Sequence, residues 1–176
     1  MRQSGKTLIV RAISARATTG VIEIGGRSYR CALGRSGRRA RKREGDGATP
    51  IGRYPLRYGM WRRDRGLPPA TGLRLRSVKH NDGWCDDARD RNYNRLVRHP
   101  YPASAEELRR GDDLYDLIVV IGHNDRPRQR GKGSAIFMHV ARPGYLPTAG
   151  CVALTARDLR LVLRHLGPGT ELVVPA

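Results

Sequence analysis

Residues 133–154 read GSAIFMHVARPGYLPTAGCVAL and carry the strongest signal for both fold and chemistry. A strand is expected over residues 134–141, where alternation places Phe137 and His139 on one face. A loop rich in proline and glycine follows, and Cys151 comes directly after a glycine at its far end. If this loop doubles back, His139 lies within reach of Cys151.

Two capping-box sequences predict helices in the flanking regions. Thr155-Ala-Arg-Asp158 precedes apolar residues at positions 159, 162, 163 and 166, which is helical spacing, and Gly167-Pro168 ends the segment. Ser104-Ala-Glu-Glu107 begins in the same way and predicts a short helix through Leu108. We therefore expect two or three short helices.

Strand signals dominate the remainder of the chain. Residues 21–33 form a hairpin pattern around Gly25-Gly26, since two glycines supply the positive φ angles of a tight turn. Further strands are expected over residues 7–13, 115–121 and 171–174. The chain has 176 residues, so we predict a mainly β fold in a single domain over residues 1–176.

The charge is unusual for a globular composition. Lys and Arg number 34 against 16 Asp and Glu, which leaves a formal charge of +18. This balance is typical of a nucleic-acid binder or of a protein that works against an anionic matrix or membrane surface. Residues 35–43 alone hold six positive charges without an apolar stripe, which predicts an exposed loop.

Several classes are excluded by what the sequence lacks. No apolar run reaches the roughly 18 residues of a transmembrane helix, and the first residues lack the apolar core of about 7 to 15 residues found in signal peptides. The three cysteines form no C-x-x-C pair, and no histidine stands at zinc-finger spacing. The sequence therefore requires neither a metal nor another cofactor.

The chemistry suggested by Cys151 and His139 is acyl transfer. A thiol with a pKa of about 8.5 is only a few per cent thiolate at neutral pH, and an adjacent imidazole takes its proton and later returns one to the leaving amine. Gly150 allows close approach of a substrate beside N–H groups suited to an oxyanion. A single cysteine is nevertheless more often a core residue, which is our interpretation of Cys31 and Cys85.

The same segment resembles the L,D-transpeptidase catalytic domain (YkuD-like) family, which carries a histidine after a strand and then Ser/Thr-x-Gly-Cys. This chain supplies His139 and Thr148-Ala-Gly-Cys151, followed by Val152. The likeness covers most of residues 31–175. It includes residues 31–35, 44–52 and 131–137 and the pair Tyr93-Asn94.

The resemblance implies a β-sandwich or barrel of mixed sheets and a peptidoglycan substrate. Cys151 would attack the peptide bond before the terminal D-alanine of a stem tetrapeptide, and the diaminopimelate amine of a second stem would accept the acyl group in a 3→3 cross-link. His139 would be the base, oriented by a backbone carbonyl, and Thr148 and Gly150 would frame the oxyanion site. The resemblance also implies acylation by carbapenems and a location in the cell envelope or periplasm.

Two positions depart from the family pattern. Many members have His or Lys where this chain has Ala149, and Arg where it has Ala153. If that arginine holds a substrate carboxylate, another residue must take its place. The candidates for substrate binding are His123, Asn124, Arg126 and Arg142.

Two other functions remain open from the sequence. The same Cys/His pair would serve an L,D-carboxypeptidase, or an amidase that cuts at diaminopimelate. A basic nucleic-acid-binding module is a candidate of a different class, but only 6% of residues are aromatic and no nucleic-acid-binding motif is present. We therefore expect anionic cell-wall polymers and stem peptides as partners, and no specific nucleic acid.

Overall fold

The computed structural model describes residues 6–176; the first five, which begin the stretch considered above for a signal peptide, lie outside it. The elements of the described chain, in order, are β1 (Thr7–Arg11), β2 (Thr19–Ile24), β3 (Arg27–Ala32), β4 (Arg38–Arg39), β5 (Thr49–Pro50), β6 (Gly52–Trp61), β7 (Leu75–Ser77), β8 (Asp82–Cys85), β9 (Arg95–Arg98), β10 (Ala105–Glu107), β11 (Leu117–Ile121), β12 (Phe137–Val140), the 3₁₀ turn η1 (Pro143–Tyr145), β13 (Val152–Leu154), α1 (Ala156–Leu163) and β14 (Glu171–Val174).

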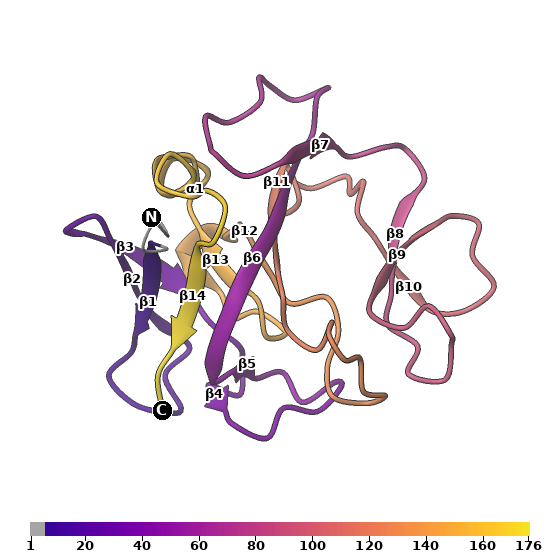
Figure 1. Cartoon of the computed structure of the whole chain (residues 1–176), viewed down its shortest axis with the longest axis horizontal. Coiled ribbons are helices and arrows are strands. Elements are labelled where there is room, and N and C mark those ends of the chain that lie inside the picture. The colour runs from indigo at the N-terminus through magenta and orange to yellow at the C-terminus, as the bar shows by residue number, and fades with distance from the viewer. Residues whose placement is uncertain (1–5) are drawn as a thin grey trace.

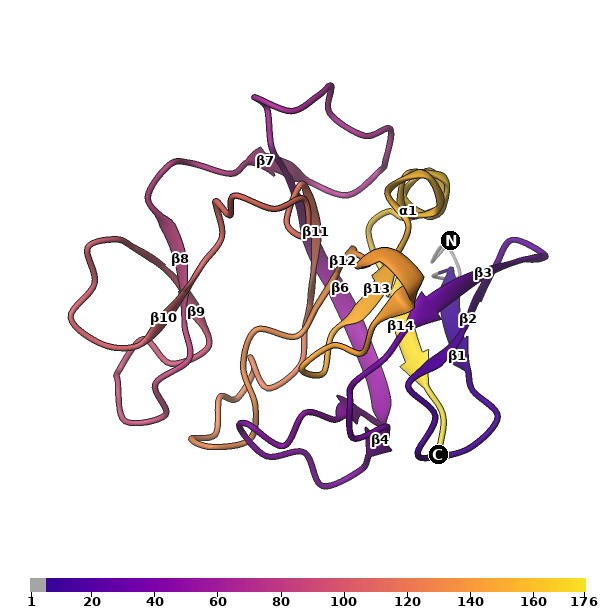
Figure 2. The ribbon, with the colours of Figure 1, turned by 180° about the vertical axis from the view of Figure 1, so that it is seen from behind.

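Most strands belong to one mixed sheet that closes on itself. Its order is β11-β12-β13-β3-β2-β1-β14-β6-β7, and an additional pairing of β11 with β6 joins the two ends (Figures 1 and 2). The long strand β6 makes this possible, because its first residues pair with β14 and its last with β11. The predicted mainly β fold of mixed sheets is confirmed.

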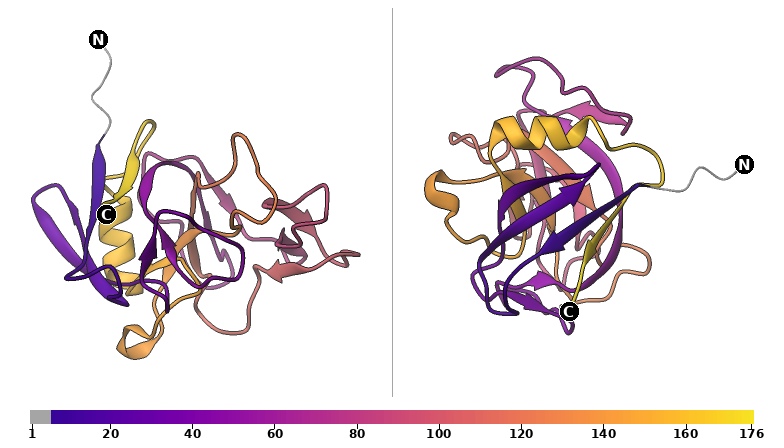
Figure 3. Two further views of the ribbon diagram at one scale, coloured as in Figure 1. Left: turned by 90° about the horizontal axis from the view of Figure 1, so that it is seen from below. Right: turned by 90° about the vertical axis from the view of Figure 1, so that its left-hand side faces the viewer.

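The predicted hairpin and the helix predicted after Thr155 are also present. Gly25 and Gly26 have φ angles of 58° and 74° and join β2 to β3. In α1 the Thr155 side chain accepts a hydrogen bond from the Asp158 amide at 3.1 Å, which satisfies one free N–H of the first turn. The helix packs across the barrel with its apolar side inward (Figure 3).

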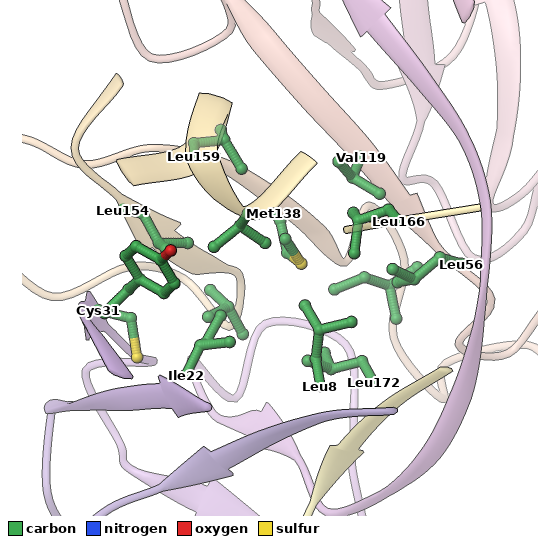
Figure 4. Packing of buried hydrophobic residues seen from close by; sticks show 14 of the residues in the cluster. Leu8, Ile22, Cys31, Leu56, Val119, Met138, Leu154, Leu159, Leu166 and Leu172 are labelled. Carbon is green, nitrogen blue, oxygen red and sulfur yellow. The ribbon is translucent and has the colours of Figure 1, made fainter. Parts of the chain in front are cut away.

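The buried residues form two clusters on opposite faces of β11 and β12. The barrel core includes Leu8, Ile22, Cys31, Leu56, Val119, Met138, Leu154, Leu159, Leu166 and Leu172 (Figure 4). The cavity-side cluster contains Met60, Val78, Trp84, Leu108, Leu114, Tyr115, Ile118, Val120, Phe137 and Cys151. The strands alternate, so Val119 and Met138 enter the core whereas Ile118 and Phe137 face the other way.

The prediction of a helix from Ser104 through Leu108 is wrong. Residues 105–107 form strand β10, which pairs antiparallel with β8 in a small sheet of order β10-β8-β9 that stands apart from the barrel in Figure 1. Pairing with β8 satisfies the backbone of this short segment, and Leu108 is fully buried beside it. Tertiary contacts therefore override the local capping signal, and α1 is the one α-helix of residues 6–176.

The prediction of an exposed loop over residues 35–43 is wrong in part. Arg38 begins β4 and is buried, with its guanidinium donating to the carbonyls of Pro175 and Ser14 at 2.7 and 3.2 Å. Lys42 is also buried, beside the Asp46 carboxylate. The remaining basic side chains of the run, Arg35, Arg39, Arg41 and Arg43, are exposed.

No helix within residues 6–176 is long and apolar enough to cross a membrane.

Candidate active site

The thiol of Cys151 lies at the start of β13, against the residues that lead into β12. Its sulfur accepts a hydrogen bond from the Phe137 amide at 3.4 Å and donates one to the Ala135 carbonyl at 3.2 Å. Ala135 has a φ of 52°, a left-handed conformation that breaks the predicted strand before Phe137. This kink turns the Ala135 carbonyl toward the thiol.

A tight turn over residues 148–151 holds Cys151 in place. The Thr148 hydroxyl donates to the Cys151 carbonyl at 2.7 Å and accepts from the Gly150 amide at 3.1 Å. Gly150 has a φ of 133°, and a Cβ there would stand 2.8 Å from the Ala48 carbonyl oxygen. Only glycine fits this position without displacing backbone.

His139 is oriented by the main chain. Its Nδ1 lies 2.8 Å from the Val140 carbonyl oxygen and therefore carries the proton that it donates, which leaves the Nε2 lone pair as an acceptor. The His139 and Tyr115 rings pack edge to face, with their centroids 5.4 Å apart. The histidine is thus fixed in one tautomer.

His139 and Cys151 line the same cavity, which has a volume of about 350 Å³. The described residues show no hydrogen bond between the two side chains, and the thiol is instead bonded to the backbone of Phe137 and Ala135. Thr148, Arg142, Ala149 and Ala153 also line the cavity. The last two present only a methyl group to the cavity.

Burial keeps both groups of the pair neutral at rest. It raises the pKa of the Cys151 thiol to about 12, with a contribution from the Glu106 carboxylate that the Phe137 amide partly offsets. It lowers the pKa of His139 to about 4, despite the bond to Val140. The thiolate of Cys151 and the imidazolium of His139 are therefore both disfavoured in this environment.

Three carboxylates, Glu44, Asp86 and Glu106, line the cavity wall, and Glu44 and Glu106 were not predicted as site residues from the sequence. The Tyr115 hydroxyl donates to Glu106 at 2.6 Å, so a carboxylate and His139 contact opposite parts of the same tyrosine. Glu44 accepts from the Ser134 hydroxyl at 2.7 Å and also from Tyr93. Ser134 and Tyr93 lie 90 and 49 positions from Glu44 in the chain, so no local pattern could have indicated these two contacts.

The cavity wall also contains cations. Arg35 and Lys42, from the basic run over residues 35–43, line it together with Arg110 and Arg142, so part of that run lies at the site. Arg110 binds Asp112 through two hydrogen bonds of 2.8 and 2.7 Å and stands over the Tyr115 ring. The site therefore combines positive and negative side chains around the thiol.

The four residues predicted to bind substrate do not gather in one place. Arg142 lies in the cavity wall, whereas His123 and Arg126 line a different cavity, and Asn124 lines neither. The His123 ring is bonded to the Lys132 carbonyl at 2.9 Å. Asn124 bonds the carbonyls of Gln129 and Gly133, each at 2.9 Å, and closes its own loop.

The motif is matched by a comparison with protein families. A family model described as the L,D-transpeptidase catalytic domain (YkuD) matches residues 6–174. An L,D-transpeptidase from Mycobacterium smegmatis is similar in structure, with 12% identity and a TM-score of 0.41 over 98% of this chain and 59% of that one. For L,D-transpeptidase 1 of Mycobacterium tuberculosis the values are 17%, 0.37, 98% and 63%.

The chain therefore spans about three fifths of the length of these two structures. The comparison with curated proteins finds no match. The family model covers nearly the whole chain, and on that ground the protein belongs to the L,D-transpeptidase catalytic domain family.

Proposed function

We propose that the protein is a cysteine-dependent L,D-transpeptidase that forms 3→3 cross-links between peptidoglycan stem peptides. The observation that carries this proposal is the shared cavity of Cys151 and His139, with the imidazole held in the tautomer that accepts a proton. In this role the donor is a stem tetrapeptide and the acceptor is the side-chain amine of diaminopimelate. The family supports action in the cell envelope.

The first half-reaction forms the thioester. Entry of the substrate displaces the Cys151 thiol from the Ala135 carbonyl, its proton passes to Nε2 of His139, and the sulfur attacks the carbonyl carbon before D-alanine. When the tetrahedral intermediate collapses, the imidazolium gives its proton to the departing amine of D-alanine. The acyl group then remains on Cys151.

The second half-reaction returns the enzyme to its resting state. The acceptor amine attacks the thioester and gives a proton to His139, and the released Cys151 sulfur regains a proton from that imidazolium. Water in place of the amine would make the enzyme an L,D-carboxypeptidase. The neutral resting pair favours activation only with substrate bound, because solvent alone does not stabilise the thiolate.

The oxyanion site that we propose lies at the turn over residues 148–151. The Gly150 amide already donates to the Thr148 hydroxyl, so it is not the donor. We assign that role to the Cys151 amide, with Thr148 and Gly150 shaping the turn that presents it. The charged groups of Arg142 and Glu106 line the same cavity and suit the carboxylates and amines of a stem peptide.

The test combines covalent labelling with product analysis. The protein is mixed with a carbapenem, and intact mass spectrometry is followed by peptide mapping. An adduct on Cys151 that is missing from a Cys151→Ala variant supports the nucleophile, whereas an adduct on Cys31 or Cys85 contradicts it. Cys31→Ala is the matched control, since it removes a buried thiol outside the cavity.

Purified disaccharide tetrapeptides then separate transferase from hydrolase. A transpeptidase yields a cross-linked dimer and free D-alanine, and a carboxypeptidase yields tripeptide and D-alanine without dimer. Dimer formation that persists in the Cys151→Ala variant would remove the basis of the proposal.

A further inference from the structure

Two further cavities border β6. One has a volume of about 320 Å³ and the other about 250 Å³, and both are lined by Arg57 and Tyr58. No residue of either lines the cavity of Cys151. We call the pair the basic groove, after the arginines that line it: Arg57, Arg74, Arg76, Arg95, Arg126 and Arg128.

Only two of these arginines have a carboxylate partner. Arg57 binds Asp125 through two bonds of 2.7 and 3.1 Å, and Arg76 binds the buried Asp82 at 2.8 Å. The structure of residues 6–176 gives no carboxylate partner to Arg74, Arg95, Arg126 or Arg128. The groove thus presents guanidinium groups whose charge the protein itself does not neutralise.

The unpaired guanidinium groups also repel one another electrostatically. Partial burial lowers the pKa of Arg128, and the positive charges of Arg95 and Arg126 lower it further, with Asp125 acting in the opposite direction. The one side-chain hydrogen bond that the structure gives Arg128 is a 3.3 Å contact to the Asn94 carbonyl. An anion bound between these arginines would remove the repulsion and supply acceptors for their N–H groups.

We infer that the basic groove binds a linear polymer that carries an oxyanion, phosphate or carboxylate, on each repeating unit. A polymer fits better than a small anion because free arginines line both cavities, and the two cavities meet at a shared wall. Arginine suits either oxyanion through its planar set of donors. This site goes beyond the proposed catalytic function, since it needs no thiol.

The groove lacks the feature that single-stranded nucleic acids require. The aromatic rings that line it are those of Tyr58, Trp84 and His123, and none of the three residues is exposed as a stacking platform. The large apolar side chains that are exposed are all aliphatic among residues 6–176: Ile13, Leu67, Leu96 and Leu146. A polymer without bases is therefore the better match.

This assignment also changes where the positive charge acts. The basic run over residues 35–43 uses Arg38 and Lys42 inside the protein, so its available charge is smaller than the sequence indicates. The groove instead offers exposed arginines around defined cavities.

Binding is measured by fluorescence anisotropy at about 0.15 M salt, where weak surface attraction is largely screened. The probes are labelled inorganic polyphosphate, poly-L-glutamate and an oligothymidylate. The test variant carries Arg95→Gln, Arg126→Gln and Arg128→Gln. The matched control carries Arg16→Gln, Arg27→Gln and Arg157→Gln, three exposed arginines that line neither groove cavity.

Polyphosphate, polyglutamate or both are expected to bind the wild type. The groove variant should bind at least about tenfold more weakly and lose about 2–3 from the slope of log K against log salt, whereas the control changes less than about twofold. The probe that binds identifies phosphate or carboxylate as the recognised group. Circular dichroism of both variants confirms that each is folded.

Three results overturn the inference. Equal losses in the groove variant and the control would show unspecific attraction to a positive protein. Groove-dependent binding of oligothymidylate as tight as that of the other probes would make this a nucleic-acid site. Absence of binding by both polyphosphate and polyglutamate would leave no polyanion site. The Cys151→Ala variant should bind like the wild type, so a failure of the proposed catalysis is seen separately.

Discussion

Cys31 and Cys151 are both buried thiols whose pKa is raised to about 12 by burial, yet their surroundings differ. Cys31 is fully enclosed in the barrel core, where its neighbours are aliphatic and aromatic side chains. Cys151 belongs to the cavity-side cluster and touches a cavity that also contains His139. A raised thiol pKa alone therefore does not distinguish a structural cysteine from a candidate nucleophile.

The same contrast runs along β11 and β12. Val119 and Met138 face the barrel core, while Ile118 and Phe137 face the cavity-side cluster. Alternation within one strand thus assigns neighbouring residues to stability and to the site. Substitutions on the two sides should have separable effects, and the predictions below test that separation in order of decreasing size.

The largest difference is expected between Cys151→Ala and Cys31→Ala. The first should lower turnover of a stem tetrapeptide by about 10⁴-fold or more, because no other group can form the acyl-enzyme. The second should retain turnover and lose about 1–2 kcal/mol of unfolding free energy through lost packing. Steady-state kinetics and urea unfolding measure the two quantities. Equal loss of activity in both would contradict the comparison.

For leucines in the two clusters, the larger loss of stability is expected in the barrel core and the larger effect on substrate binding on the cavity side. Leu159 is fully buried in the core, so Leu159→Ala should cost about 2–5 kcal/mol of unfolding free energy. Leu114 lies at the edge of the cavity-side cluster and lines the cavity. Leu114→Ala should cost less than about 2 kcal/mol and act mainly on KM, since a residue next to open space leaves little enclosed void. A stability loss at Leu114 larger than about 2 kcal/mol would show that the cavity-side cluster contributes to folding as the barrel core does.

Much of this division could be predicted from local sequence. Helix α1, the hairpin around Gly25-Gly26 and the strand that contains His139 follow from apolar spacing and turn chemistry over a few residues. The motif with Cys151 indicated the family, which the family model confirms. Each of these signals depends on neighbours in the chain.

The remainder depends on residues that are distant in sequence. The strand β10 replaces a predicted helix because β8 pairs with it, and the Ser134 hydroxyl reaches Glu44 across 90 positions. The left-handed conformation of Ala135, whose carbonyl accepts from the thiol, could not be predicted from its residue type, because alanine rarely adopts a positive φ. Closure of the barrel and the charged cavity walls were therefore not predictable from local patterns.

The acid dependence of stability should report the burial of His139. Its pKa is about 4 when folded and 6.5 as an unperturbed side chain, so the unfolded state binds a proton first as the pH falls. The stabilisation is complete above about pH 6.5 and is lost toward pH 4, with a total of about 3 kcal/mol at 1.36 kcal/mol per pKa unit. Urea unfolding across this range measures it.

His139→Gln should flatten this part of the stability curve, although it lowers stability at pH 7. His80→Gln is the control, because His80 is exposed. An unchanged slope in His139→Gln would show that the imidazole is hydrated in the folded state. In that case water would reach the cavity side further than the burial of His139 in the structure indicates.

Gly150 provides the smallest and most local test of the cavity side. In Gly150→Ala a residue with φ of 133° gains a Cβ 2.8 Å from the Ala48 carbonyl oxygen and 3.2 Å from Ile136. Backbone strain alone costs about 1–3 kcal/mol, and relief of the contacts must shift the turn that presents the thiol. Turnover should fall more than stability does, because a small displacement of Cys151 misaligns it with the reacting carbonyl.

Gly26→Ala is the matched substitution in the barrel hairpin. Gly26 has a φ of 74°, and a Cβ there meets no atom within 4 Å, so this variant should show the backbone strain without the contacts. Its turnover should remain that of the wild type, as measured on the same tetrapeptide. If both alanines lowered turnover alike, the turn at Gly150 would be no more tightly coupled to the thiol than a distant hairpin. The division between the barrel core and the cavity side would then describe packing alone.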